Sequence, residues 1–266
     1  MSIEEFQELV WQKGNELFRP MPWREDTRPY YVLVSELMLQ QTQVERVIPK
    51  FQEFIRSFPT IGDLASSSLE QVLQHWSGLG YNRRAKFLWE SAKMVQHDFN
   101  GIFPETAEGL VRLPGVGKNT AGAIMAYSFN QPVVYIETNI RTAFFYHFFE
   151  HNEQVTDAEL LAKATEMLDH EHPREWYWAL MDYGSHLKRQ GIGLNSKSAH
   201  YKRQAPLKGS VREVRGQIIK QLTQYDMYEQ QLKVAVQADE RFEKALSGLR
   251  SDGLVSTTGE RLHLSR

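Results

Sequence analysis

The 266-residue sequence contains no cysteine. Disulfide bonds, thiolate catalysis, cysteine-bound zinc and cysteine-held iron–sulfur clusters are therefore excluded. The sequence also lacks any apolar run near the roughly 20 residues that span a bilayer, and its N-terminal MSIEEFQELVWQ has neither the basic nor the apolar region of a signal peptide. These absences predict a cytoplasmic protein with no membrane partner.

The chain also lacks an overall excess of positive charge, since its formal net charge is -2. A net negative charge over the whole chain argues against a phosphate-binding protein. Residues 185–220, however, hold nine basic residues against one acid, Glu213. The nine are Lys188, Arg189, Lys197, Lys202, Arg203, Lys208, Arg212, Arg215 and Lys220. Such a distribution favours a basic surface for a polyanion, while a solvated basic linker stays open as the alternative.

Apolar residues recur at helical spacing through the first 180 positions, so the body of the chain is predicted to be all-α. Polar residues that cap helix starts precede several of these segments, and they are Thr60 and Asp63, Thr106, and Thr156 or Asp157. Near the C-terminus three helices are predicted at 211–223, 228–236 and 240–250, followed by a hairpin around Thr258-Gly259. This order predicts a small winged-helix-like module over 208–266.

One short motif carries a chemical signal, Leu113-Pro114-Gly115-Val116-Gly117-Lys118, between predicted helices at 107–112 and 119–129. Two glycines permit a tight turn with exposed amides, and the start of the next helix adds positive potential, so the turn can hold a phosphate oxygen. A plain glycine-rich turn is the alternative. The order L-P-G-V-G-K between amphipathic helices favours a helix-hairpin-helix anchor for the DNA backbone.

From about Pro22 to Gly184 the chain resembles the MutY-type adenine glycosylases of the helix-hairpin-helix superfamily. The matching segments are PWR (22–24), PYYVLVSELMLQQTQVERVIPKF (29–51), FPTIGDLA (58–65), GLGYNRRAKFL (78–88), FPET (103–106), LPGVGKNTAGAI (113–124) and MDYGS (181–185). The resemblance implies a mainly α, two-lobed fold. A six-helix barrel with the hairpin (22–131) faces a second helical lobe (1–21 and 132–207), DNA lies in the groove between them, and the target base is flipped into a pocket there.

The resemblance places the general acid at Glu36, within Ser-Glu-Leu-Met-Leu-Gln-Gln-Thr. Cleavage of a purine N-glycosidic bond needs a proton for the departing base, and a carboxyl in apolar surroundings has a pKa high enough to supply it. A solvent-facing helix carboxylate is the alternative. Endonuclease III-type pyrimidine enzymes carry no acid at this position, so they resemble the segment less well.

The resemblance places a second carboxylate, which stabilises the cationic sugar, at Glu137, with Asn139 as its companion. The family has Asp where this chain has Glu137, and the added methylene moves the carboxylate by roughly 1.5 Å. A compensating backbone, an altered substrate and a helix N-cap in an impaired site all stay open.

The lysine that gives bifunctional relatives their β-lyase activity would fall at Asn119, and an amide cannot form a Schiff base. Lys118 should point elsewhere on the helix, toward phosphate. The resemblance therefore predicts a monofunctional enzyme that leaves an abasic site.

By resemblance, the predicted DNA contacts surround the hairpin, the segment after Glu36 and the end of the second lobe, with Gln41 as the wedge into the base stack. They are Gln40, Gln41, Thr42, Tyr81, Asn82, Arg83, Arg84, Gly115, Gly117, Lys118, Asn119, Thr120, Lys188 and Arg189. The family usually has a second aromatic residue where this chain has Asn82, which leaves recognition of the opposite base open.

Two departures from the family are predicted. By resemblance, the family's four cysteine ligands would fall at Lys188, Asn195, Ser198 and Gln204. No iron–sulfur cluster is therefore expected, and no metal ligands are predicted. The side chains expected to pack in place of the cluster are Trp176, Trp178, Leu180 and Leu187. A monovalent cation at the hairpin stays open. The family's Nudix-like domain, which reads 8-oxoguanine, is replaced by the winged-helix-like module.

The sequence thus predicts a monomeric, nucleoid-associated DNA N-glycosylase of base excision repair that acts on double-stranded DNA with a damaged or mismatched pair. The expected target is a mispaired purine, adenine opposite 8-oxoguanine or guanine. A mismatch thymine or uracil glycosylase and a catalytically silent lesion-binding protein are the alternatives.

Overall fold

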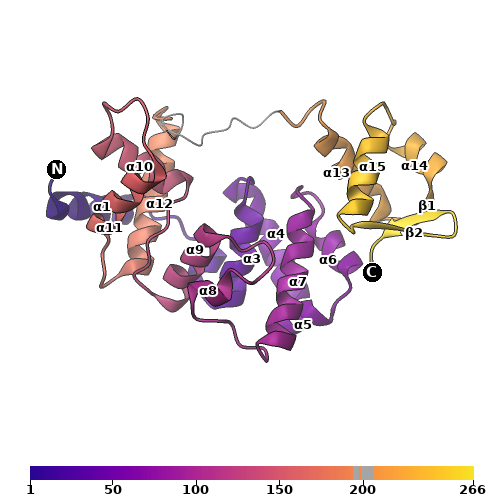
Figure 1. Cartoon of the computed structure of the whole chain (residues 1–266), viewed down its shortest axis with the longest axis horizontal. Coiled ribbons are helices and arrows are strands. Elements are labelled where there is room, and N and C mark those ends of the chain that lie inside the picture. The colour runs from indigo at the N-terminus through magenta and orange to yellow at the C-terminus, as the bar shows by residue number, and fades with distance from the viewer. Residues whose placement is uncertain (194–197, 199–205) are drawn as a thin grey trace. The chain divides into compact units, whose positions relative to one another are not determined.

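The computed structural model describes residues 1–193, 198 and 206–266 (Figure 1). The chain folds into two compact units. The first unit comprises 1–32, 104–112 and 116–203, and the second comprises 33–103, 113–115 and 204–266. The three-domain division expected from the sequence stays a prediction.

The first unit is built from helices at both ends of its sequence. They are α1 (Ile3–Leu17), α2 (Pro22–Glu25), α8 (Ala107–Leu110), α9 (Lys118–Phe129), α10 (Thr138–Phe148), α11 (Asp157–Met167) and α12 (Pro173–Arg189). α12 packs against both α1 and α10, which brings the N-terminal helix beside helices more than a hundred residues away (Figure 1). The buried ring of Phe6 lies 5.3 Å from that of Phe144 and 6.0 Å from that of Trp176.

The predicted core of this unit is largely confirmed. Trp176, Leu180 and Leu187 are buried on α12, whereas Trp178 is half-buried, with its ring 6.3 Å from that of Tyr127.

Two of the recognised motifs meet in a buried ion cluster of the first unit. Asp182, in MDYGS, accepts two hydrogen bonds from Arg24, in PWR, at 2.6 and 3.1 Å. It accepts two more from Arg19, from the side chain at 2.7 Å and from the backbone N–H at 3.2 Å. Asp182 and Arg24 are both buried, and a bidentate guanidinium–carboxylate pair is the geometry in which a buried charge is best satisfied. These motifs therefore fix α2 against α12.

The second unit begins within α3 (Pro29–Leu39) and continues through α4 (Val44–Ser57), α5 (Ile61–Ser66), α6 (Leu69–Trp76) and α7 (Arg83–Asp98). The helix predicted from Thr60 onward is in fact two. Thr60 caps α5 with Asp63 in a capping box, as predicted, but Ser68 forms a second capping box with Gln71 and starts α6. Thr106 and Thr156 cap α8 and α11 as predicted.

The C-terminal part of the second unit confirms the predicted module of three helices and a hairpin. It contains α13 (Val211–Leu222), α14 (Glu229–Ala235) and α15 (Phe242–Ser251), with the hairpin strands β2 (Val255–Thr258) and β3 (Arg261–Leu264) (Figure 1). A short strand that the sequence did not indicate, β1 (Met227–Tyr228), completes an antiparallel sheet in the order β1-β3-β2.

Throughout the described ranges, no helix has both the length and the hydropathy of a membrane span.

Candidate active site and nucleic-acid interface

Glu36 lies on α3, a helix whose neighbouring side chains are almost all buried. Leu33, Ser35, Leu37 and Met38 are each at most 1% exposed, and Glu36 is half-buried among them. A carboxyl beside such an apolar surface is in the setting that a general acid requires. Its catalytic role stays a prediction.

Glu137 is the N-cap of α10, and its side chain points back to the helix. Oε1 accepts a hydrogen bond from the backbone N–H of Asn139 at 2.8 Å. Burial raises the pKa of Glu137, although the N–H groups of Asn139 and Thr138 and the charge of Lys188 act in the opposite direction. Glu137 is thus a helix N-cap whose carboxylate is fixed at the start of α10, and its catalytic role stays a prediction.

Asn139 and Lys188 complete this corner of the first unit. Lys188 Nζ donates a hydrogen bond to Asn139 Oδ1 at 3.3 Å, so α12 places an ammonium group close to the start of α10. Lys188 also stands where the resemblance puts the first cluster cysteine. Its donor cannot ligate iron, and Ser198, at another ligand position, forms a parallel β-bridge with Val155. These residues do not fit an iron–sulfur cluster.

Asn119 supports the segment that leads into Glu137. Its Nδ2 donates a 2.7 Å hydrogen bond to the carbonyl of Ile136. The position at which the family carries the lyase lysine is therefore occupied by an amide with a structural contact. Lys118, the adjacent residue, is exposed, as its predicted phosphate role requires.

The hairpin has the expected backbone. Gly115 has a φ of +78°, and a Cβ atom there would lie 2.9 Å from Phe87, so only glycine fits this turn. The carbonyl of Pro114 accepts a 2.8 Å hydrogen bond from Ser91. Gly117 is exposed and is the N-cap of α9, with no side chain to cover the helix start. This geometry suits an anionic oxygen at the first turn, which also carries Lys118, Asn119 and Thr120.

Arg84, one of the predicted DNA contacts, points into the protein. It is buried, and its guanidinium donates to the carbonyls of Leu37 at 2.7 Å, Met38 at 3.0 Å and Gly80 at 3.1 Å, and to Thr42 Oγ1 at 3.2 Å. Burial lowers the pKa of Arg84 to about 10, which leaves it charged at neutral pH. Arg84 therefore joins the end of α3 to the loop before α7, and its contact with DNA stays a prediction.

Two residues next to those bonded by the Arg84 guanidinium have unusual backbone angles. Gln41 has a φ of +59° and Tyr81 a φ of +48°, and both side chains are exposed. Non-glycine residues adopt this left-handed conformation at a cost on the order of 1–3 kcal/mol, and it is found most often at functional sites. Gln40, Thr42, Asn82 and Arg83 flank these two residues. Their contacts with DNA stay predictions.

Part of the predicted basic surface lies outside the described residues, namely Lys197, Lys202 and Arg203, together with the ligand positions Asn195 and Gln204. Within the described part, Lys188 and Arg189 are exposed at the end of α12.

Sequence reasoning missed a pocket in the second unit. Arg212, Arg215 and Leu207 line it together with the loop at Tyr81. Arg212 and Arg215 stood in the basic stretch, and their spacing of three residues on a predicted helix was the signal that they share a face.

Solved structures show the class of this fold. A thermostable thymine-DNA glycosylase matches with a TM-score of 0.61 at 23% identity, over 69% of this chain and 86% of that chain. Endonuclease III in a trapped DNA covalent intermediate matches with a TM-score of 0.55 at 17% identity, over 77% of this chain and 91% of that chain. The fold is that of the helix-hairpin-helix DNA glycosylases.

Sequence comparison shows the family. Residues 34–169 match the model of the HhH-GPD superfamily of base excision DNA repair proteins, and the chain belongs to this superfamily. It is 38% identical over 168 residues to the adenine DNA glycosylase of Buchnera aphidicola subsp. Baizongia pistaciae (strain Bp), over 63% of this chain and 48% of that protein. It is 47% identical over 131 residues to the adenine DNA glycosylase of Rattus norvegicus, over 46% of this chain and 25% of that protein. The match thus spans less than half the length of either relative. The family resemblance inferred from the motifs is confirmed.

Proposed function

We propose that this protein is a monofunctional DNA N-glycosylase that removes adenine from double-stranded DNA in which it is mispaired with 8-oxoguanine or guanine. The observation that carries the proposal is Glu137, a carboxylate fixed at the start of α10 by the N–H of Asn139. The two relatives described above are adenine DNA glycosylases, and the superfamily model matches residues 34–169, which include Glu36. We further propose that the protein acts as a monomer in the cytoplasm, on nucleoid DNA.

The reaction divides between the two carboxyl groups. Glu36, protonated, gives its proton to the departing adenine as the N-glycosidic bond breaks and its electron pair moves onto the base. Glu137, ionised, stabilises the positive charge that develops on the sugar until water adds and loses a proton. Asn119 has no amine with which to attack the sugar carbon, so the product is an intact strand with an abasic site.

A strand-cleavage assay over a panel of duplexes tests this proposal. The panel pairs adenine, thymine and uracil with each ordinary base and with 8-oxoguanine, and every reaction is run with and without hot alkali. We expect cleavage only after alkali and only at adenine opposite 8-oxoguanine or guanine. Cleavage at thymine or uracil would support the mismatch pyrimidine reading, strand breaks without alkali would contradict the monofunctional assignment, and binding without cleavage would support the silent reading.

A further inference from the structure

Two residues at which the chain differs from its family meet at the start of α10. Glu137 stands where the family has Asp, and Lys188 stands where the resemblance places the first cluster cysteine. Both contact Asn139. Its backbone N–H donates to Glu137 Oε1 at 2.8 Å, and its side-chain Oδ1 accepts from Lys188 Nζ at 3.3 Å. A lysine at a cysteine position thus reaches the residue that holds the candidate catalytic carboxylate.

The packing of α12 against α10 brings Lys188 to this place. Gly184 lies four residues before Lys188 on α12, so the two residues share one face of the helix. Gly184 lies against the backbone of Asn139, so closely that a side chain there would overlap the carbonyl group. The next turn of α12 therefore starts beside the Asn139 side chain, and Lys188 extends from that turn.

The two helix ends at this corner have opposite polarity. Lys188 lies in the last turn of α12, where a cation is favoured, but also at the first turn of α10, where a cation is disfavoured. A carboxylate at the N-cap of α10 offsets the second effect, and Glu137 is that N-cap. Burial raises the pKa of Glu137, and the charge of Lys188 opposes this rise. Lys188 and Glu137 therefore favour each other's charged form.

The other groups around the candidate catalytic carboxylate have different positions or partners. Arg141, one turn further along α10, forms an ion pair with Asp157 of α11 at 2.8 Å. His186 lies two residues before Lys188, on the opposite side of α12. From α9, Asn119 brings a neutral amide to the carbonyl that precedes the carboxylate. Lys188 is thus the cation that the packing of α12 directs to this corner.

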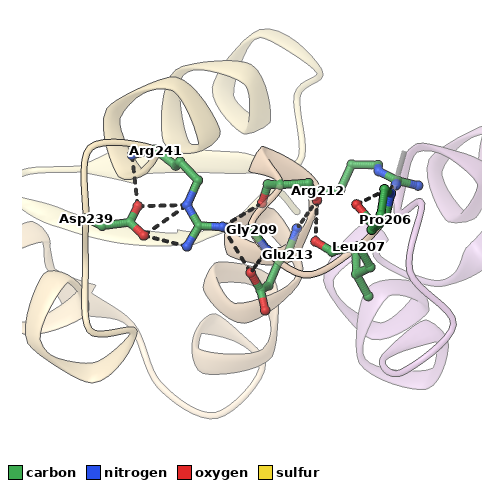
Figure 2. Close-up of polar contacts among 8 residues, drawn as sticks. Pro206, Leu207, Gly209, Arg212, Glu213, Asp239 and Arg241 are labelled. Atoms are coloured by element: carbon green, nitrogen blue, oxygen red, sulfur yellow. Dashed lines mark hydrogen bonds and ion pairs between the residues drawn. The ribbon is translucent and has the colours of Figure 1, made fainter. Parts of the chain in front are cut away.

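The basic stretch predicted at 185–220 divides between the two units. In the second unit, Arg212 donates to the carbonyl of Pro206 at 3.4 Å, and Glu213, the acid of the stretch, accepts from Arg241 at 3.0 Å. Figure 2 shows these contacts around the start of α13. Lys188, by contrast, belongs to the first unit and bonds to a residue of α10. The charges of the stretch therefore have separate local partners.

We propose that Lys188 is a positioning residue for the candidate catalytic carboxylate, because its ammonium group, bonded to Asn139, holds Glu137 ionised at the start of α10. The ammonium acts through its electric field, since its hydrogen bond goes to the Asn139 amide. The inference rests on the proposed function in one respect, that Glu137 stabilises a cationic sugar, for which the carboxyl must be ionised.

Carbon-13 NMR of the side-chain carboxyl groups tests the proposal in the full-length protein without DNA. The Glu137 signal is the one that disappears in Glu137→Gln, and it is followed from pH 4 to 9. We expect the pKa of Glu137 to be higher in Lys188→Met, because the neighbouring cation is gone. Lys188→Arg keeps the charge and should keep the wild-type pKa. A purely structural role of Lys188 does not predict this difference between Met and Arg.

Lys163→Met is the matched control, because Lys163 also lies against α10, at the far end. Its Nζ is 5.3 Å from the ring centroid of Phe148, the last residue of the helix. The length of α10 separates it from Glu137 by about 16 Å, which exceeds the Debye length at physiological salt. Lys163→Met should therefore leave the pKa of Glu137 unchanged.

Single-turnover excision of adenine over the same pH range links the lysine to the reaction. Lys188→Met should lose about threefold or more at the acid end of the profile and recover as pH rises, since its Glu137 ionises at higher pH. An unchanged pKa of Glu137 in Lys188→Met overturns the inference, and a loss of duplex affinity alone would assign Lys188 to DNA contact instead. A raised pKa in a protein that excises no adenine supports the pairing and contradicts the proposed function. Excision with an unchanged pKa contradicts the pairing alone.

Discussion

Gly184 of α12 lies directly against the backbone of Asn139 at the start of α10. A Cβ atom at Gly184 would be 2.0 Å from the Asn139 carbonyl oxygen and 2.5 Å from its carbonyl carbon, far inside contact distance. Because the N–H of Asn139 holds Glu137, this close approach of two helices sets the position of the candidate catalytic carboxylate.

Gly184→Ala is predicted to displace the first turn of α10 and with it Glu137. Overpacking of this kind costs about 1–3 kcal/mol or more, and excision should fall further than stability alone explains. Urea unfolding and single-turnover excision measure the two effects. Gly62→Ala in α5 is the control, since a Cβ there would meet its neighbours only at 3.5 Å or more and alanine in a helix is favourable. Wild-type stability and activity in Gly184→Ala would contradict this account.

Replacement of Glu137 tests its part in the chemistry. Glu137→Gln keeps an oxygen that can accept from Asn139 but removes the charge, so we expect single-turnover excision to fall by about 10²-fold or more. Glu137→Asp should also lower the rate, because its shorter side chain is a good N-cap but withdraws the carboxylate by about one bond length. A higher rate in Glu137→Asp would instead show that the family geometry is the better one. Equal rates in all three proteins would exclude Glu137 from the mechanism.

The raised pKa of Glu137 predicts a pH signature in stability. Between the ordinary glutamate pKa of about 4.3 and the raised folded value, the folded state binds more protons than the unfolded state. The contribution of Glu137 to stability therefore falls as pH rises through this window. Urea midpoints from pH 4 to 8 should show the difference between wild type and Glu137→Gln declining over that interval. A difference independent of pH would contradict the burial of this carboxyl.

Replacement of Arg84 and replacement of its neighbour Arg83 should have opposite effects on stability and on DNA affinity. Arg84→Ala leaves several buried carbonyls without their donor, and we expect a loss on the order of 3 kcal/mol in the free energy of unfolding. Arg83→Ala removes a side chain that is 60% exposed, so stability should be nearly unchanged while duplex affinity falls and its salt dependence flattens. Urea unfolding and DNA titrations at several salt concentrations measure both. The reverse pattern would restore Arg84 as the phosphate contact.

The sequence was most informative where structure is local. Thr60, Thr106 and Thr156 cap helices through hydrogen bonds three residues away, so the residues themselves specify the helix start. The break at Ser68 was missed although it is equally local, because the apolar spacing continues through it. The strand at Met227 was missed because two residues carry no alternation and only pairing with β3 defines them.

Side-chain roles that depend on tertiary packing were less predictable. Arg84 stands beside Arg83 in the same motif, and only the fold shows that it donates to the carbonyls of Leu37 and Met38, 47 and 46 residues away. The contact between Arg212 and Tyr81 joins residues separated by 131 positions, so no local pattern indicates it. The candidate acid and the hairpin were recognised because each is a continuous motif.

Excision by Glu36→Gln is the most direct test of the central claim, that the protein is an adenine glycosylase with Glu36 as its general acid. The measurement is the single-turnover release of adenine opposite 8-oxoguanine, revealed by alkali, alongside the affinity for the same duplex. We expect the wild type to produce abasic sites and Glu36→Gln to bind with nearly unchanged affinity but to lose at least 10²-fold in rate, since an amide cannot donate the proton. A variant with the wild-type rate, or a wild type that binds but releases no adenine, would contradict the account.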